Sequence, residues 1–197
     1  MSLPDGMLYQ LPQFLSVDDA GNLLTNLTEA LAWQQHRLWL FGRERLTPRL
    51  CAWYGDADAR YAYSGQALDP LPWTASLEDL RQRIEATLAC RFNSVLANLY
   101  RDGADSMGWH SDDEASLGPE PVIASLSLGD TRRLVLKHRR RADLASVDIP
   151  LAAGSLLVMA GRLQTHWRHC VPKTRRPVGP RINLTFRLIT PVAARIP

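Results

Sequence analysis

The sequence contains little cysteine, and this scarcity excludes several classes of protein. Its three cysteines, Cys51, Cys90 and Cys170, are odd in number and widely spaced, and no CxxC pair occurs. A disulfide-stapled secreted scaffold and a zinc ribbon both need more cysteine, or more closely spaced cysteine, than this. We therefore expect free thiols and a reducing compartment, and we predict a cytoplasmic protein.

Long apolar runs and a large excess of one charge are also missing. No run approaches the roughly 18 residues of a membrane-spanning helix, and the first residues lack the pattern of a secretory signal. Lys and Arg number 23 against 20 for Asp and Glu, which permits a polyanionic partner without requiring one. With 197 residues, 46% of them hydrophobic, the chain is predicted to form one globular domain.

Two amphipathic helices are predicted in the first half of the chain. The first follows Ser16, and its leucines recur at a spacing of four. The second is predicted to begin near Ser76, after a proline-rich segment. Residues 1–15 are expected to be an extended lead-in, and the material between the helices, with short strands over 38–41, 50–54 and 61–64, is rich in aromatic residues and arginine.

After residue 91 the hydrophobic pattern is typical of β-structure. The longer predicted strands cover 94–100, 122–128, 134–137, 155–159 and 182–189. Shorter strands are predicted near His110, Ile149 and His169. Closely spaced strands with glycine and proline turns indicate a sandwich or jelly roll, so the predicted fold class is α+β with a β core.

The triplet His110-Ser111-Asp112 is a candidate metal-binding pattern. Residues two apart on an extended chain point to the same side, so one metal ion can contact both. Imidazole and carboxylate suit Fe(II), and a second histidine would complete a two-histidine, one-carboxylate set. The triplet alone is more often a polar surface turn. His166 and His169 lie on opposite faces of a predicted strand, and spacing does not choose between them.

The segment from Arg181 to Leu188 alternates strictly between polar and apolar side chains. A strand with one solvent face and one core face has this pattern. Two arginines on one face, with an amide and a hydroxyl between them, also have the chemistry to bind a dicarboxylate. In the strand predicted over 94–100, Asn98 and Tyr100 share a face. Their side chains could either belong to the core or contact a ligand.

Taken together, these segments resemble the AlkB family of Fe(II)- and 2-oxoglutarate-dependent dioxygenases. The resemblance runs through FNSVLANLYRDGADSMGWHSDDE, PVIASLSLGDTRR, WRHCVP and PRINLTFR, and upstream through PRLCAWYGD and YAYSG, over about residues 35–190. The joint order Asn-x-Tyr, HxD, His and RxNxxxR is specific, although no single piece is. The branch that it resembles most includes the animal homologues that repair DNA.

The resemblance implies a role for each matching residue of the catalytic machinery. It assigns three iron ligands, with the WRHCVP context selecting the second histidine: His110, Asp112 and His169. It assigns the contacts to 2-oxoglutarate to Asn98, Tyr100, Arg181, Asn183, Thr185 and Arg187. Fe(II), 2-oxoglutarate and O2 are the cofactor and cosubstrates that it implies.

The same resemblance implies a set of residues that contact the substrate. Asp113 matches an acid that touches the flipped base. The base pocket matches Tyr61, Ala62 and Tyr63. The finger that wedges into the duplex gap matches Phe41, Gly42 and Arg43. The loop that contacts phosphates matches Arg175 and Arg176. Tyr63 departs from the phenylalanine of the duplex-acting relative, and stacking on a base survives this change.

The implied organisation is one compact domain with two parts. Residues 1–90 would hold the N-terminal helices and a nucleotide-recognition lid of hairpins, and residues 91–197 a double-stranded β-helix, or jelly-roll, catalytic core. The implied partner is alkylated DNA, single- or double-stranded, with RNA as a second candidate; we expect a monomer that does not bind membranes.

The implied reaction is oxidative demethylation of bases such as 1-methyladenine and 3-methylcytosine, with release of formaldehyde and succinate. Three alternatives stay open: a hydroxylase of a protein or small molecule, a non-catalytic reader of alkylated nucleic acid, and a zinc hydrolase. The hydrolase would leave the paired arginines unexplained.

Overall fold

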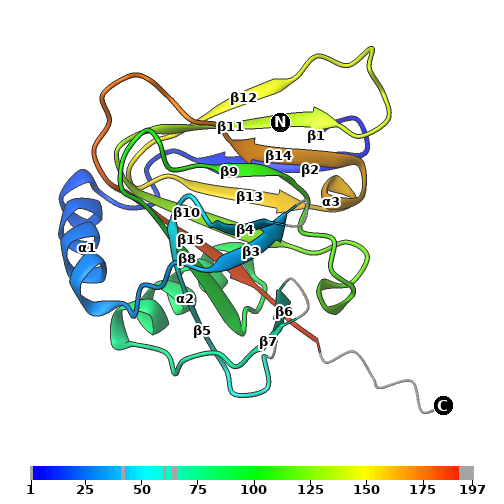
Figure 1. Cartoon of the computed structure of the whole chain (residues 1–197). Coiled ribbons are helices and arrows are strands. Elements are labelled where there is room, and N and C mark those ends of the chain that lie inside the picture. The colour runs from blue at the N-terminus through cyan, green and yellow to red at the C-terminus, as the bar shows by residue number, and fades with distance from the viewer. Residues whose placement is uncertain (1, 41–42, 60, 64–65, 191–197) are drawn as a thin grey trace.

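Two antiparallel sheets form the body of the protein in a computed structural model that describes residues 2–40, 43–59, 61–63 and 66–190 (Figure 1). The large sheet contains, in spatial order, β1 (Ser2–Leu3), β2 (Gly6–Leu11), β13 (Leu156–Ala160), β10 (Ile123–Gly129), β15 (Arg181–Arg187), β8 (Ser94–Tyr100) and β5 (Leu50–Gly55). The small sheet contains β12 (Val147–Leu151), β11 (Arg132–His138), β14 (Trp167–Val171) and β9 (Met107–His110). The predicted α+β class with a β core is confirmed.

Two hairpins project from this body. One joins β3 (Arg37–Leu40) to β4 (Arg43–Leu46), and the other joins β6 (Tyr61–Tyr63) to β7 (Gln66–Leu68). Both belong to the segment between the two long helices, where the sequence predicts short strands and turns.

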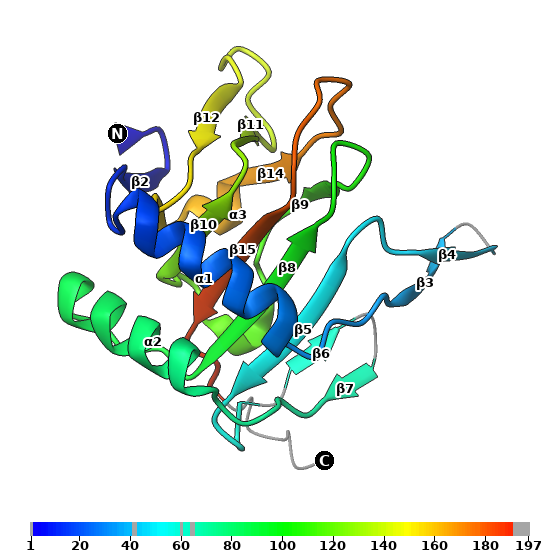
Figure 2. The same ribbon diagram turned by 90° about the vertical axis from the view of Figure 1, so that its left-hand side faces the viewer.

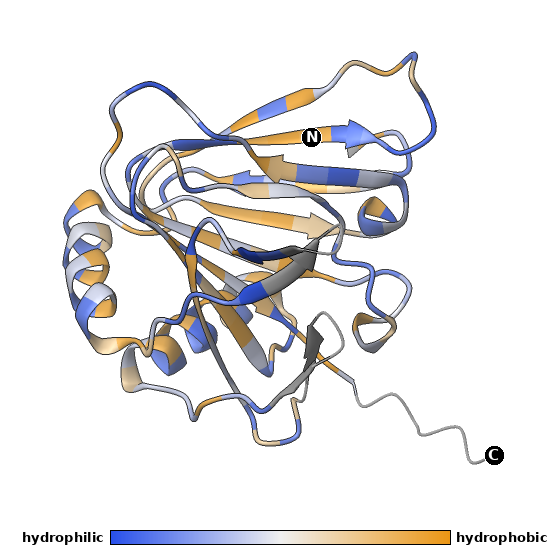
Figure 3. Ribbon diagram, in the orientation of Figure 1, coloured by the Kyte–Doolittle hydropathy of each residue, from blue (hydrophilic) through white to orange (hydrophobic). Residues whose placement is uncertain are grey.

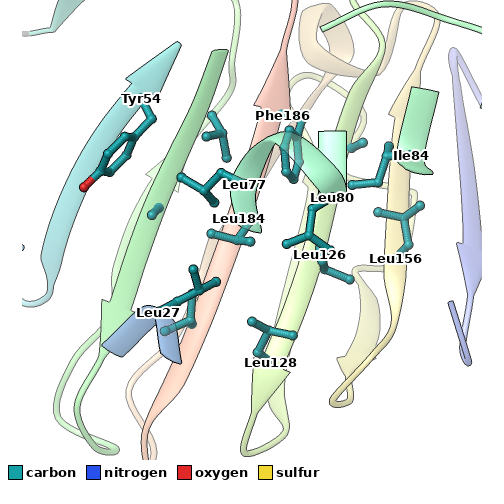
Figure 4. Close-up of a cluster of buried hydrophobic side chains, with 14 of the residues drawn as sticks. Leu27, Tyr54, Leu77, Leu80, Ile84, Leu126, Leu128, Leu156, Leu184 and Phe186 are labelled. Carbon is teal, nitrogen blue, oxygen red and sulfur yellow. The ribbon is translucent and has the colours of Figure 1, made fainter. Parts of the chain in front are cut away.

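The helices α1 (Val17–Ala30) and α2 (Ala75–Leu88) cover the outer face of the large sheet (Figure 2). Their apolar stripes pack on β10, β15 and neighbouring strands, and Figure 4 shows Leu27, Leu77 and Ile84 over the sheet. All three side chains are fully buried. Burying each contributes about 1.5–3 kcal/mol, which explains why the helices form in this place.

The two helix starts differ in how well the sequence predicts them. The Ser16 side chain caps α1 by accepting a hydrogen bond from the Asp19 backbone N–H at 3.1 Å, as predicted. The second helix begins at Ala75, near Ser76 as predicted, but its cap is Thr74. Thr74 has the extended backbone that a cap needs, and its hydroxyl accepts from the Leu77 N–H at 3.3 Å. Ser76 already lies in the first turn.

The N-terminal segment is part of the large sheet rather than only an extended lead-in. β2 pairs with β13 in antiparallel register, from Leu11 opposite Leu156 to Met7 opposite Ala160. Strands on both sides of residue 90 therefore belong to one sheet. A single-turn helix, α3 (Leu163–His166), and a short 3-10 turn (Ala115–Leu117) complete the described elements. None of the described helices is long and apolar enough to cross a membrane.

The space between the sheets holds a second core and a polar region. Leu136 and Trp167 of the small sheet pack with Ile123 and Leu157 of the large sheet. β13 is hydrophobic along its length in Figure 3. β15 is different because polar and apolar side chains alternate along it, and all seven positions are buried, including the polar ones. The polar face of this strand is therefore inside the protein and not in solvent.

Candidate metal and cosubstrate site

The two predicted histidine ligands face each other across the pair of strands β9 and β14. His110 is directly opposite His169 in the antiparallel register, and their ring centroids are 4.2 Å apart. Asp112 follows β9, with its Oδ1 3.8 Å from His110 Nε2. One ligand atom from each of the three residues lies within 4.8 Å of the other two. The fold thus brings together the three residues predicted to bind iron.

The hydrogen bonds around this cluster prepare it for a metal ion. His110 Nδ1 lies 2.9 Å from the Gly108 carbonyl oxygen, a bond that requires the proton on Nδ1 and leaves the Nε2 lone pair toward Asp112. The Asp112 backbone N–H donates to Gln164 Oε1 at 2.9 Å, and Arg187 donates to Asp112 Oδ2 at 2.9 Å. Two imidazoles and an oriented carboxylate fit Fe(II).

The charge states of the cluster also suit metal binding. Burial by itself would raise the pKa of Asp112, but Arg187 and the two histidines hold it at about 2. Burial, with a contribution from His110, lowers the pKa of His169 to about 3. At neutral pH the site therefore offers an ionised carboxylate and a neutral imidazole at His169, which are the forms that bind a metal ion.

The predicted cosubstrate residues lie on two neighbouring strands, β8 and β15. Asn98 is opposite Asn183, and Tyr100 is opposite Arg181. One cavity is lined by the three metal-site residues together with the cosubstrate residues Asn98, Tyr100, Asn183, Thr185 and Arg187. The alternating pattern of β15 thus places a polar face beside the metal cluster.

Arg181 has the environment of an arginine that binds an anion. It is fully buried, its guanidinium carbon lies 5.2 Å from the centre of the Tyr100 ring, and its Nη2 donates to Ser127 Oγ at 2.9 Å. Its Nε and Nη1 atoms are buried without a hydrogen-bond partner in the described part of the chain. Burial lowers the pKa of Arg181 to about 10, so it remains a cation at neutral pH. A carboxylate of 2-oxoglutarate fits this uncompensated cation.

Arg187 occupies a different position from Arg181. It forms a buried ion pair with Asp112 while it also lines the cavity. The second arginine of the RxNxxxR pattern therefore connects the metal cluster to the cosubstrate face.

Some residues of the site carry no signal in the sequence. Gln164, which is 2% exposed, comes from α3, a single turn that the pattern of hydrophobic residues does not predict. Arg49 is 4% exposed, and its Nε donates to Asn98 Oδ1 at 2.7 Å. The Asn183 side chain donates to Ser125 Oγ at 2.8 Å. Each contact joins residues that lie far apart in the chain, so local patterns do not reveal it.

The predicted substrate residues are less closely grouped. Asp113 is exposed, and its Oδ2 accepts a hydrogen bond from Arg139 at 2.7 Å. Arg175 and Arg176 are exposed in the loop between β14 and β15. The structure describes the backbone of Arg43 in β4 and that of Tyr61, Ala62 and Tyr63 in β6. Phe41 and Gly42 lie outside the described residues.

The fold and the cluster of two histidines and a carboxylate are those of iron oxygenases, and a family model agrees. The model for the 2OG-Fe(II) oxygenase superfamily matches residues 7–187, so the chain belongs to this superfamily. The chain is 42% identical over 191 residues to alpha-ketoglutarate-dependent dioxygenase alkB homolog 3 of Homo sapiens, covering 91% of the chain. It is 42% identical over 161 residues to DNA oxidative demethylase ALKBH2 of Mus musculus, covering 79% of the chain and 67% of the relative. The resemblance to the AlkB family is therefore confirmed.

Solved structures support the fold. The structure of OsALKBH1 superposes with a TM-score of 0.66 at 17% identity, over 95% of this chain and 100% of that one. A prolyl-4-hydroxylase of Pseudomonas putida superposes with a TM-score of 0.52 at 22% identity, over 92% of both chains. The jelly-roll prediction is confirmed. The chain spans 65% of the length of the human alkB homolog 3.

Proposed function

We propose that this protein is an Fe(II)- and 2-oxoglutarate-dependent dioxygenase that removes N-alkyl groups from bases in DNA. The observation that carries the proposal is the placement of Arg181 on the strand that lies beside the His110, Asp112 and His169 cluster. Arg181 is a buried cation that has no carboxylate partner among the residues that the structure describes. The names of the relatives, a dioxygenase and a DNA oxidative demethylase, support the substrate class.

The residues of the chain have separate tasks in this reaction. His110, Asp112 and His169 would hold Fe(II), and Arg181 would bind a carboxylate of 2-oxoglutarate. When bound there, iron and 2-oxoglutarate would supply the chemistry for oxidation of an N-methyl group by O2, with formaldehyde, succinate and CO2 as products. Gln164 would orient Asp112 through its backbone N–H, and Arg187 through its Oδ2. The apolar side chains of Leu134 and Met159 line the cavity and limit access of water.

The substrate residues complete the proposal. A base inside a duplex is out of reach, so it must be flipped into a pocket, and a lesion that weakens pairing reduces the energy needed. We assign the base pocket to Tyr61, Ala62, Tyr63 and Asp113, the finger to Phe41, Gly42 and Arg43, and phosphate contacts to Arg175 and Arg176. The proposed lesions are 1-methyladenine and 3-methylcytosine, the proposed state is a cytoplasmic monomer, and RNA is a second substrate to be tested.

One assay tests this function. The protein is incubated in air with Fe(II), 2-oxoglutarate and an oligonucleotide that contains 1-methyladenine, and the unmethylated base and succinate are measured by mass spectrometry. We expect both products in equal amounts. An unmethylated oligonucleotide and an RNA of the same sequence are run in parallel. Absence of demethylation, with succinate still formed in the presence of a peptide or small-molecule substrate, would overturn the proposal in favour of another hydroxylase.

A further inference from the structure

A basic hollow of about 220 Å³ lies beside the catalytic region. Its walls come from two segments, the turn after β11 and the α3 region, and we call it the arginine hollow. The side chains that line it are Arg139, Arg140, Arg162, Thr165 and His166. None of these residues is assigned to the metal or the cosubstrate, and the turn after β11 contains both hydrophilic and apolar stretches in Figure 3.

The two walls of the hollow are tied together by hydrogen bonds. The Arg139 backbone N–H donates to the His166 carbonyl oxygen at 2.7 Å. The backbone N–H groups of Arg140 and Arg141 donate to His138 Nδ1 at 3.2 and 2.9 Å. His138 is buried, and its ring centroid lies 5.9 Å from that of His166 and 5.2 Å from that of Trp167. The turn that carries the arginines is therefore fixed before any ligand arrives.

The hollow carries positive charge that the protein does not compensate. Arg140 and Arg162 are exposed, and neither forms an ion pair within the described ranges of the chain. The next arginine in the turn differs, because Arg141 pairs with Asp143 at 2.6 Å. The two unpaired guanidinium groups carry hydrogen-bond donors and no acceptor, and the Thr165 hydroxyl can add one more donor, so the hollow is suited to an oxyanion.

A metal ion does not fit this place, although His138 and His166 lie close to Asp5. His138 Nδ1 accepts two backbone N–H bonds, so the proton of the neutral ring must be on Nε2. The Nε2 atom, which lies 3.5 Å from Asp5 Oδ2, then has no lone pair to offer a cation. The ligand suited to the hollow is an anion.

The position of the hollow indicates which anion it binds. Arg139 lines the hollow and also donates to Asp113, and Asp113 directly follows the metal-site residue Asp112 in the chain. An anion in the hollow would therefore lie next to the residue assigned to the flipped base. We propose that the arginine hollow binds a backbone phosphate of the nucleic-acid strand whose base enters the catalytic site. This inference rests on the proposed DNA substrate and is separate from the loop of Arg175 and Arg176.

The salt dependence of binding tests the inference directly. The double variant Arg140→Ala, Arg162→Ala is compared with the wild type by fluorescence anisotropy, using a labelled single-stranded oligonucleotide with and without 1-methyladenine. One lost phosphate contact lowers the slope of log K against log salt by about 0.7, and the affinity at about 50 mM salt should fall about tenfold. The loss should be the same for both oligonucleotides, because the phosphate carries no lesion.

The matched control is the double variant Arg133→Ala, Arg141→Ala on the same β11–β12 hairpin. It also removes two positive charges, but these arginines already pair with Asp148 and Asp143. An unchanged slope in both variants, or the same fall in both, would overturn the inference. A third outcome is that the wild type binds inorganic phosphate in calorimetry, and the Arg140, Arg162 variant loses this binding but keeps its affinity for the oligonucleotide. The hollow would then bind a small anion, and the inference would also fail.

The result is independent of the demethylation assay. A reduced slope in the Arg140, Arg162 variant without any demethylation would support the phosphate site and reject the proposed function. Demethylation by the wild type, with an unchanged slope in the variant, would support the proposed function and reject the phosphate site. Thermal unfolding of each variant, followed by circular dichroism, confirms that the comparison is made between folded proteins.

Discussion

Arg187 Nη2 donates a 2.9 Å hydrogen bond to Asp112 Oδ2, although 75 residues separate the two in the chain. Both side chains are buried, and Asp112 is a member of the metal cluster while Arg187 ends the polar face of β15. The carboxylate is thus held ionised and oriented by the same strand that carries Arg181. This contact links the proposed iron site to the proposed cosubstrate site.

The first prediction concerns Asp112. The substitution Asp112→Ala removes a metal ligand and should abolish binding of Fe(II) and turnover, while binding of the oligonucleotide persists. It also breaks the buried ion pair between Asp112 and Arg187, which should lower the free energy of unfolding by about 3–5 kcal/mol. Metal content by elemental analysis, urea unfolding and anisotropy measure the three effects. Asp112→Asn, which keeps the shape, is the control for packing, and retained demethylation in Asp112→Ala would contradict the ligand assignment.

The second prediction concerns Arg181. In the wild type, 2-oxoglutarate at 100 times its Kd, with Mn²⁺ as a redox-stable metal, should raise the free energy of unfolding by about 2.7 kcal/mol. Arg181→Met should remove this ligand-induced gain because the buried cation that binds the carboxylate is gone. The measurement is thermal unfolding with and without 2-oxoglutarate. Arg91→Met, at a side chain that is 86% exposed, should keep the full gain; an equal gain in Arg181→Met would reject the carboxylate contact.

The third prediction is a dependence of stability on pH that comes from Asp105. This carboxylate is 4% exposed and accepts from the Arg101 backbone N–H at 2.9 Å and from Nε at 2.8 Å. Burial would raise its pKa, but the hydrogen bonds and charge of Arg101 outweigh burial and lower it. Because the folded pKa is depressed, the stabilisation is fully present above the unfolded value of about 4 and is lost as pH falls through the folded pKa.

The substitution Asp105→Asn tests this origin. At pH 7 it should lower the free energy of unfolding by about 1–3 kcal/mol, and the difference from the wild type should shrink below pH 4. Urea unfolding at several pH values between 7 and 3 measures both. Asp58→Asn changes an exposed acid and should leave the curve unaltered. A difference that stays constant down to pH 3 would show that Asp105 is not the source.

The fourth prediction concerns the loop after β14. Replacing Arg175 and Arg176 by Ala should reduce the slope of log K against log salt by about one to two, because each arginine is assigned to a backbone phosphate. Both side chains are exposed, so the fold should be unaffected. Anisotropy over a series of NaCl concentrations provides the slope. Arg91→Ala is the control for general electrostatics, and an unchanged slope in the loop variant would remove the phosphate role.

The hydrophobic periodicity of the chain predicts most strands closely, because the alternation of residues next to each other in the sequence indicates where a strand lies. The strand predicted over 94–100 is β8 with the same bounds, and the alternation after Arg181 is that of β15. The cap of α2 is displaced to Thr74, since several hydroxyls are near the helix start and only the backbone conformation selects one. β2 pairs with β13, a strand about 150 residues later in the chain, and local sequence patterns do not predict such a pairing.

The proposed metal and cosubstrate residues could be named from the sequence because HxD, WRHCVP and RxNxxxR together resemble the AlkB family, although spacing alone did not choose between His166 and His169. The sequence also determines that β15 has one polar and one apolar face. Only the tertiary structure decided that the polar face is buried and that Gln164 accepts a hydrogen bond from the Asp112 backbone N–H. It also decided that Arg187 pairs with Asp112, while Arg181 has no carboxylate partner among the described residues. It likewise joined Arg140 and Arg162 into one hollow. The reason is physical: local periodicity sets the direction of side chains, whereas burial and charge pairing depend on segments that meet only when both sheets close on each other.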